Sequence, residues 1–148
     1  MKTYTPRPRD IQPRWLVIDA RQAILGRMAS TIAHLLLGKH KPLYDVNLVT
    51  GDKVIVTNVD LLTVTGKKRE QKIYYRHTGY PGGIKAPTFD ELQAKRPTEI
   101  LRLAVKGMLP KGPRGYAMLK NLYIYTGENH PHQAQEPIPF ALEDSTYA

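Results

Sequence analysis

The sequence predicts an α/β domain with extended ends, and three features near the start of the chain support this prediction. A short apolar run at residues 15–18 is followed by a helical apolar stripe at 25–36 and by a second apolar run at 54–56. Strand, helix and strand in this order form a βαβ unit, whose two strands are parallel. With 148 residues the chain has room for one domain of ordinary size.

Each element of this unit has its own local signal. Trp15-Leu16-Val17-Ile18 is continuously apolar, which favours a strand buried on both faces. The stripe follows the i, i+3, i+4 spacing of one helix face and consists of Leu25, Met28, Ala29, Ile32, Ala33 and Leu36. Gly38 stands where a left-handed residue would end this helix, and Pro42 follows it. The β-branched run Val54-Ile55-Val56 predicts the second strand.

The middle of the chain predicts shorter elements. Residues 61–64 form either a short strand or a turn of helix, and Ile73-Tyr74-Tyr75 is typical of a strand. Residues 77–87 predict a loop because glycine and proline crowd them. These breakers are Gly79, Pro81, Gly82, Gly83 and Pro87.

Two helices and a strand complete the domain. Thr88 and Glu91 match a capping box that starts a helix, which Pro97 interrupts. The second helix runs to Gly107, and its apolar stripe consists of Ile100, Leu101, Ala104, Val105 and Met108. The loop after it contains Pro110, Gly112, Pro113 and Gly115. A short helix near 116–120 and a strand at 122–125 follow.

The two ends differ from this middle part. Residues 1–14 contain three prolines and carry four basic residues against one acid, which predicts a basic N-terminal arm. Residues 128–148 are polar and proline-rich, with four acids and no Lys or Arg, and predict a C-terminal tail that is either extended or disordered. The α/β domain would occupy residues 15–127, and we expect the binding surface of the protein to lie in this domain.

Composition favours a polyanionic partner. The chain has 22 Lys and Arg against 13 Asp and Glu, a formal charge of +9 and a pI near 9.8. Nucleic acid is favoured over a membrane because the charge is not gathered on one amphipathic helix. No apolar run reaches the roughly 18–20 residues that span a bilayer, and the N-terminus lacks the apolar region of a secretory signal. The absence of cysteine excludes disulfides and thiolate metal sites and is compatible with a reducing cytosol.

The motifs of common enzymes are missing, so we expect no enzyme and no cofactor. Residues 19–26 lack the glycine series that lets backbone approach a pyrophosphate. Gly66-Lys67-Lys68 resembles the end of a phosphate loop only superficially. Ser30 and Ser145 are the only serines, and neither lies in a nucleophile elbow. A small phosphate-handling enzyme therefore remains only as an alternative.

The histidines do not favour chemistry either. His130 and His132, beside Glu128 and Glu136, form at most a weak metal cluster, and a polar tail segment contacting a partner or water is favoured. His40 and His77 lie in basic or glycine-rich loops and are better placed to bind phosphate than to act as a general base.

Two loop regions suit RNA. Between Lys67 and His77 cations alternate with Tyr74 and Tyr75, so phosphates could be neutralised and bases stacked, unless one tyrosine belongs to the core. Residues 100–127 carry five basic residues and no acid. Within them, the glycines of residues 106–115 would allow close backbone approach and the prolines would limit the entropy lost on docking; the alternative is an ordinary surface loop.

The run Val105-Lys106-Gly107-Met108-Leu109-Pro110-Lys111-Gly112-Pro113-Arg114-Gly115 closely resembles the signature of the large-subunit ribosomal protein thirteen family in its bacterial form. Other segments agree in order and spacing: 15–19, 25–27, 38–41, 50–52, 64–66, 74–79, 82–85 and the tail segment 130–137. The resemblance covers about residues 1–138. It departs at Tyr80-Pro81 and in the extension from Phe140 to Ala148.

This resemblance implies a three-layer α/β/α domain around a four-stranded, mainly parallel sheet, with extended N- and C-terminal arms. It implies a non-enzymatic constituent of the large ribosomal subunit in the cytoplasm, bound to ribosomal RNA from early assembly and lying beside other ribosomal proteins. No membrane and no small-molecule substrate is expected. Binding to messenger RNA, for example in autoregulation, is a further possibility that does not exclude the first.

The expected RNA-binding residues come from both arguments. The resemblance points to Lys39, His40, Lys41, Lys67, Lys68, Arg69, Arg76, His77, Lys106, Lys111 and Arg114. The interleaved basic stretch adds Lys72, and the acid-free stretch adds Lys120.

Overall fold

The computed structural model describes residues 4–142, so residues 1–3 of the predicted arm and 143–148 of the predicted tail lie outside the described part. Its strands are β1 (Trp15–Asp19), β2 (Lys53–Thr57), β3 (Arg76–His77), β4 (Ile84–Lys85), β5 (Leu122–Ile124) and β6 (Ile138–Pro139). Its α-helices are α1 (Leu25–Leu37), α2 (Lys68–Gln71), α3 (Phe89–Lys95), α4 (Pro97–Met108) and α5 (Pro113–Leu119). Short 3-10 turns are η1 (Pro8–Asp10), η2 (Ala20–Gln22), η3 (Val59–Leu61) and η4 (Gln133–Gln135).

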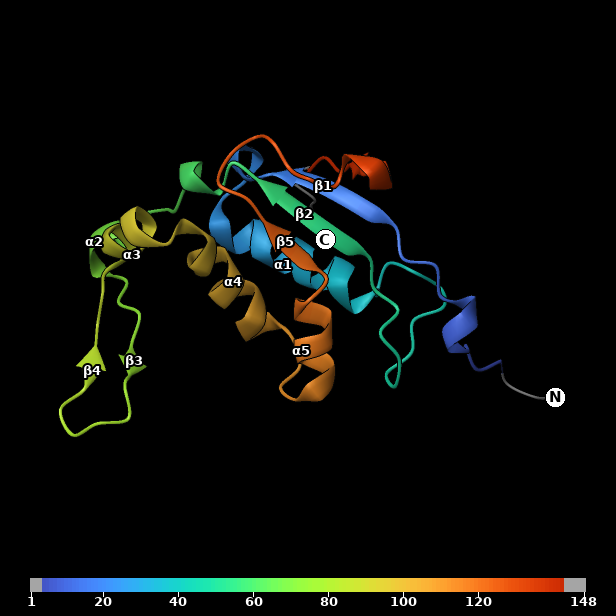
Figure 1. Cartoon of the computed structure of the whole chain (residues 1–148), viewed down its shortest axis with the longest axis horizontal. Coiled ribbons are helices and arrows are strands. Elements are labelled where there is room, and N and C mark those ends of the chain that lie inside the picture. The colour runs from blue at the N-terminus through green and yellow to red at the C-terminus, as the bar shows by residue number, and fades with distance from the viewer. Residues whose placement is uncertain (1–3, 143–148) are drawn as a thin grey trace.

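A four-stranded parallel sheet lies at the centre of the molecule, in the order β5-β2-β1-β6 (Figure 1). β1 and β2 pair in parallel from Trp15 opposite Lys53 to Asp19 opposite Thr57, with α1 connecting them. The predicted βαβ unit is therefore confirmed. So is the expected mixed α/β fold with its four-stranded sheet.

Helix α1 begins and ends where its sequence pattern predicts. All six residues of the predicted stripe are buried, because they face the sheet and the neighbouring helix α4. Gly38 adopts a left-handed conformation with φ of 79°, and its N–H donates to the carbonyl oxygens of His34 and Leu35. This left-handed residue ends the helix. Glycine occupies the position because residues with a Cβ rarely adopt that conformation.

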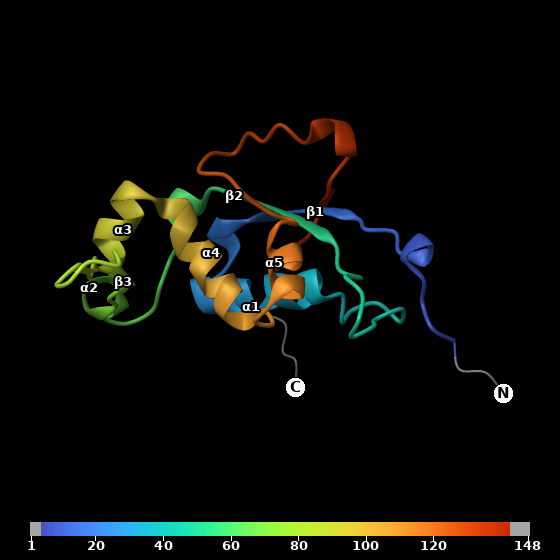
Figure 2. The ribbon, with the colours of Figure 1, turned by 60° about the horizontal axis from the view of Figure 1, so that its bottom comes forward.

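The two faces of the sheet are covered differently. Figure 2 shows α1, α4 and α5 below the sheet and the C-terminal segment with η4 above it. On the upper face Ile55 is fully buried, and His132 packs against Trp15 and Tyr123 with ring centroids 5.1 and 4.7 Å away. The second covering layer is thus mainly extended chain with one short turn.

This difference corrects one expectation. We expected the run at residues 15–18 to be buried on both faces, but only Leu16 and Ile18 are buried, while Trp15 and Val17 are half-buried. The reason is the thin upper layer, which leaves part of β1 accessible to solvent. β2, between β1 and β5, is buried from Val54 onward.

The middle of the chain differs from the prediction in three places. Residues 67–72 were expected only as a basic stretch, but they include the short helix α2. The predicted strand at 73–75 is shifted: Ile73 makes an isolated bridge to Thr88, and β3 begins at Arg76. The predicted loop at 77–87 is partly wrong, because β3 and β4 pair as an antiparallel hairpin. Two-residue strands carry too weak a periodicity for a sequence pattern to find.

The segment between α4 and β5 needs a similar correction. Pro113 and Gly115 were placed in a loop, but both belong to α5, which begins with Pro113. A Cβ on Gly115 would lie 1.8 Å from the carbonyl oxygen of Pro110. The protein's own packing therefore requires this glycine, whether or not RNA approaches. The predicted helix start at Thr88 is confirmed, since its side chain accepts a hydrogen bond from the Glu91 N–H, which is one of the two bonds of a capping box.

The described part of the C-terminal tail is extended and joined to the sheet. β6 pairs in parallel with β1, with Ile138 opposite Leu16. The Phe140 N–H donates to the Val17 carbonyl oxygen at 2.9 Å.

Candidate nucleic-acid interface

The first basic segment, residues 39–52, is held against the body by one buried carboxylate, and we call it the docked loop. The Asp52 side chain is 2% exposed and accepts a hydrogen bond from the Lys41 ammonium. It also bonds His40 Nε2 at 2.7 Å and accepts from the Arg14 N–H at 2.8 Å. Lys41 donates further to the carbonyl oxygens of Gln12 and Thr50. Two of the predicted RNA-binding residues, His40 and Lys41, thus bond to a buried carboxylate of the protein itself. Lys41 is half-buried, whereas Lys39 and His40 both lie in the exposed class.

The pKa of Asp52 reflects the same contacts. Burial by itself raises the pKa of this carboxyl, but the hydrogen bonds from Lys41, Arg14 and His40 outweigh burial and leave the pKa below its ordinary value. The carboxylate therefore stays ionised and keeps its cationic partners.

The second basic segment, residues 67–85, has the opposite character, and we call it the projecting segment. Its predicted residues Lys67, Lys68, Arg69, Lys72, Arg76 and His77 are all exposed. The salt bridge that involves them within residues 4–142 joins Arg69 Nε to Asp90 at 3.7 Å, with both side chains more than half exposed. Such surface pairs contribute little, so these cations remain available to an external anion.

The root of the projecting segment is fixed in the core. Phe89 is fully buried, and its N–H donates to the Lys72 carbonyl oxygen. Tyr74 packs against the core, and burial raises the pKa of its hydroxyl. The next residue, Tyr75, is 70% exposed. The alternative that one of the two tyrosines belongs to the core is therefore correct for Tyr74.

The third basic surface lies on α4 and α5. Lys106, Lys111 and Lys120 are exposed, and Arg114 is half-buried. The Lys106 ammonium lies 5.7 Å from the ring centroid of Tyr116, which is itself exposed. Aromatic and cationic groups thus meet at this surface as well.

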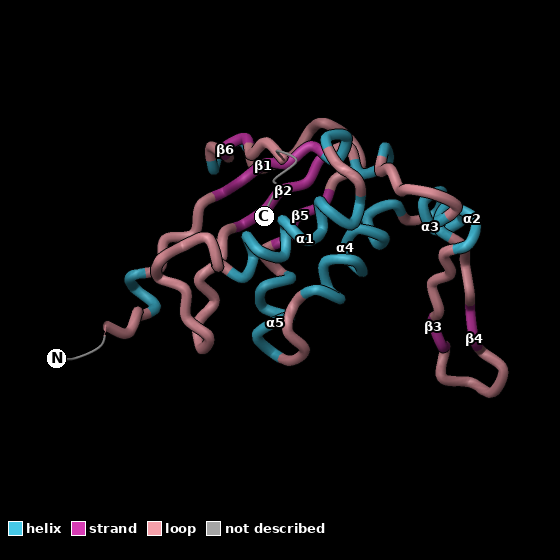
Figure 3. Tube along the Cα trace, turned by 180° about the vertical axis from the view of Figure 1, so that it is seen from behind, coloured by secondary structure: helices cyan, strands magenta, loops and turns pink. Residues whose placement is uncertain are grey.

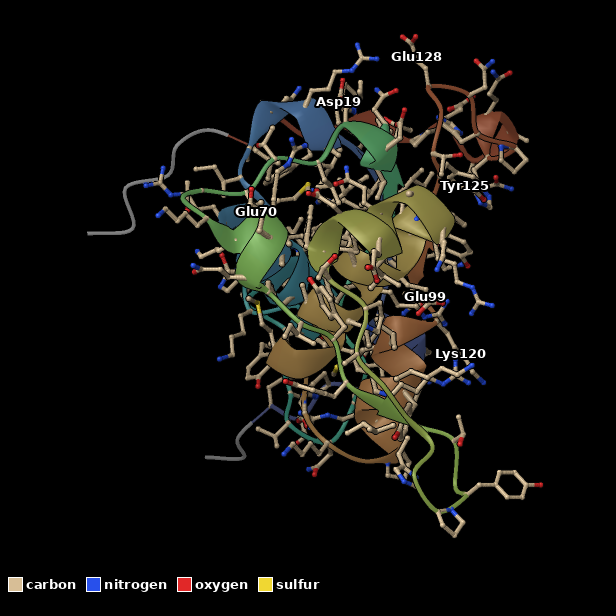
Figure 4. The ribbon with its side chains drawn as sticks, turned by 90° about the vertical axis from the view of Figure 1, so that its left-hand side faces the viewer. Asp19, Glu70, Glu99, Lys120, Tyr125 and Glu128 are labelled. Carbon is tan, nitrogen blue, oxygen red and sulfur yellow. The ribbon has the colours of Figure 1, made fainter. Side chains whose placement is uncertain are left out.

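The three basic regions reach the same edge of the molecule. In Figure 1 the turn of the β3–β4 hairpin, the loop between α4 and α5 and the docked loop all lie along its lower edge. Asp19 and Glu128 lie at the opposite, upper end in Figure 4, with Lys120 between them and the hairpin turn. The three segments that carry the predicted RNA-binding residues are therefore placed along one edge of the fold.

His132, a member of the weak metal cluster considered from the sequence, makes contacts within the protein. His132 Nε2 lies 2.7 Å from the Tyr125 hydroxyl and takes part in the aromatic packing on the upper face. Among residues 4–142, His, Asp and Glu form no group of three or more that could hold a metal ion. In the same residues, none of the helices is long and apolar enough to cross a bilayer.

Sequence reasoning did not include Lys85 or Tyr80 among the expected RNA-binding residues. Lys85 pairs directly with Arg76 across the hairpin, and Tyr80 is 76% exposed at the turn. Part of the signal was present, because Tyr80-Pro81-Gly82-Gly83 has the composition of a tight turn and indicates a hairpin. The register was not visible, because a turn of that length alone would place residue 78 opposite 85, and the structure pairs Arg76 with Lys85.

Comparison with known proteins found a matching family model and many similar sequences. The family model described as Ribosomal protein L13 matches residues 13–131. A large ribosomal subunit protein uL13 of Nitrosomonas eutropha is 56% identical over 137 residues, which are 93% of this chain and 95% of the relative. The uL13 protein of Thermobifida fusca is 54% identical over 142 residues, 96% of this chain and 95% of the relative. The chain therefore belongs to the ribosomal protein L13 family, whose members are structural ribosomal proteins and not enzymes.

Proposed function

We propose that this chain binds large-subunit ribosomal RNA in the cytoplasm, lies beside neighbouring ribosomal proteins, and supports early assembly of the large subunit. The names of its relatives support the place in the subunit. The observation that supports RNA binding most directly is the projecting segment, whose exposed cations have few carboxylate partners within residues 4–142.

In this function the α/β core is a scaffold and performs no chemistry. It holds the projecting segment and the α4–α5 surface toward folded RNA, where Lys67, Lys68 and Lys106 neutralise phosphates. Recognition then depends mostly on shape and backbone charge. Lys41 and His40 contribute indirectly, because they hold the docked loop in place through Asp52.

A filter-binding titration of the purified chain with large-subunit ribosomal RNA tests the proposal. If about six phosphates are neutralised, the slope of log K against log salt should lie near −4 to −5, from about 0.7–0.9 per contact. A flat slope, or affinity equal to that for unrelated RNA, would contradict it.

Early assembly and messenger-RNA binding need their own measurements. A protein that acts early should bind naked ribosomal RNA without other ribosomal proteins, and it should co-sediment with large subunits after a high-salt wash. A requirement for other proteins would contradict the early role. Autoregulation predicts similar affinity for the leader of the protein's own messenger RNA, and a much weaker affinity there would exclude it.

A further inference from the structure

The β3–β4 hairpin extends beyond the body of the protein. We call residues 75–85 the hairpin tip, and Figures 1 and 3 show it leaving the rest of the chain. Tyr75, Tyr80 and Ile84 in the tip are 70%, 76% and 61% exposed. A two-stranded hairpin alone is marginally stable in water, and exposed apolar side chains at its tip add nothing to the fold. Contact with a partner would explain them.

The tip is nevertheless well ordered by its own hydrogen bonds. The Gly83 N–H donates to the Tyr80 carbonyl oxygen at 2.9 Å, with Pro81 second in the turn and Gly82 third at φ of 70°. This is the arrangement of a type II turn. The Gly79 N–H donates to His77 Nδ1 at 2.9 Å, and a Cβ on Gly83 would lie 2.0 Å from the Thr78 hydroxyl. Tyr80 therefore stands on a turn that is ordered before any partner arrives.

The two faces of the tip differ in chemistry. Arg76 pairs directly with Lys85, so two cations lie together on one face. Like charges in this position oppose pairing unless an anion lies between them. His77 pairs with Ile84 on the other face, where alternation also places Tyr75. Residues 75–85 contain no acid.

We propose that the hairpin tip enters an unpaired region of the RNA, where Tyr80 and Tyr75 stack on exposed bases and Arg76 and Lys85 hold a phosphate. This inference rests on the proposed function and names the part of the RNA that the tip contacts. Cations with interleaved aromatics fit single-stranded nucleotides. A duplex fits less well, because its bases already stack and the major groove of an RNA helix is too narrow for side chains to read.

Three substitutions of Tyr80 and one control substitution test the stacking. Filter binding to large-subunit ribosomal RNA should show that Tyr80→Ala weakens affinity by about 5- to 150-fold, the range measured for base–aromatic stacking. The salt slope should stay unchanged, because no charge is lost. Tyr80→Phe should keep wild-type affinity, whereas Tyr80→Leu should lose as much as Tyr80→Ala. Tyr4→Ala, which removes a 64% exposed tyrosine from the N-terminal segment, is the matched control.

A second RNA separates stacking on unpaired bases from general contact. Against a fully paired duplex, wild type and Tyr80→Ala should bind equally. An equal loss on duplex and ribosomal RNA would overturn the unpaired-base proposal. Wild-type affinity of Tyr80→Ala or of Tyr80→Leu would also overturn it, and would assign the tip to a protein neighbour or to plain apolar contact. If wild type itself shows no salt-dependent binding, the proposed function fails instead.

Discussion

The docked loop and the projecting segment begin with nearly the same residues and behave in opposite ways. Lys39-His40-Lys41 and Lys67-Lys68-Arg69 are each three consecutive basic residues. In the first, the buried Asp52 holds two of them against the body. In the second, Asp90 is itself more than half exposed and lies 3.7 Å from Arg69. The cations of a basic run are therefore available to an external anion only when no buried carboxylate of the protein pairs with them.

Burial decides which of the two pairings matters for stability. Removing one partner of a buried ion pair leaves a charge without compensation, at a cost of about 3–5 kcal/mol. An exposed pair contributes about 0–1 kcal/mol, because water replaces the lost partner. The predictions below follow from this difference, from the largest expected effect to the smallest.

Asp52→Ala should lower the free energy of unfolding by about 3 kcal/mol, near the lower end of the range for buried pairs, because Lys41 and His40 keep some contact with water. Denaturant unfolding measures this loss. Asp90→Ala, its control in the projecting segment, should change stability by less than about 1 kcal/mol. Equal effects of the two substitutions would remove the distinction between the segments.

Acid should weaken the docked loop. The pKa of Asp52 is lower in the folded protein, because its hydrogen bonds outweigh burial. Its stabilisation is therefore complete well above about 3.9, the pKa of a free aspartate, and is lost as pH falls through the folded pKa. The unfolding free energy of wild type should fall more steeply than that of Asp52→Asn below about pH 5. Parallel pH profiles would show that Asp52 carries no such linkage.

The double substitution Lys67→Glu and Lys68→Glu should act on RNA and not on the fold. It should make the salt slope less negative by about 1.4–1.8, at roughly 0.7–0.9 per lost contact. Stability should change by no more than about 0.5 kcal/mol, as at most surface sites. Lys41→Met should show the reverse, with lower stability and an unchanged slope. If both variants lost stability and both made the salt slope less negative, the contrast between the docked loop and the projecting segment would be contradicted.

Gly107, near the end of α4, allows a test of whether the third basic surface approaches RNA with its backbone. A Cβ there would meet nothing within 4 Å, so Gly107→Ala should stabilise the helix by up to about 1 kcal/mol. If the bare backbone lies close to RNA, the same substitution should weaken binding. A Cβ at Gly26 in α1 would also meet nothing within 4 Å, so Gly26→Ala should stabilise that helix without weakening RNA binding. Gly112 is less informative, since its φ of 127° strains any other residue.

The elements predicted correctly are those whose signal lies within one short stretch of sequence. The stripe of α1, its cap at Gly38 and the apolar runs of β1 and β2 were all visible in sequence. α2, the hairpin and β6 were not. The strands β3, β4 and β6 have two residues each, and they exist because a partner strand lies beside them. Only the tertiary structure supplies that partner.

The candidate site was predictable to a similar degree. Most of the candidate cations chosen by residue type are exposed, but residue type alone could not tell that His40 and Lys41 bond to Asp52. Asp52 was the missing information: it lies immediately before the buried strand β2, where a charged side chain must find partners. An acid at such a position, with a basic run that ends 11 residues before it, indicates an internal pair.

The pairing of β6 with β1 has a consequence for synthesis of the chain. β1 forms near the beginning and its outer neighbour near the end, so one edge of the sheet stays open until residues 138–139 leave the ribosome that makes them. Open strand edges attract other strands, and nascent copies on one messenger RNA lie close together. Premature termination before this point would leave a fragment with an open strand edge, and the pairing of Ile138 and Pro139 with β1 covers that edge in the finished chain.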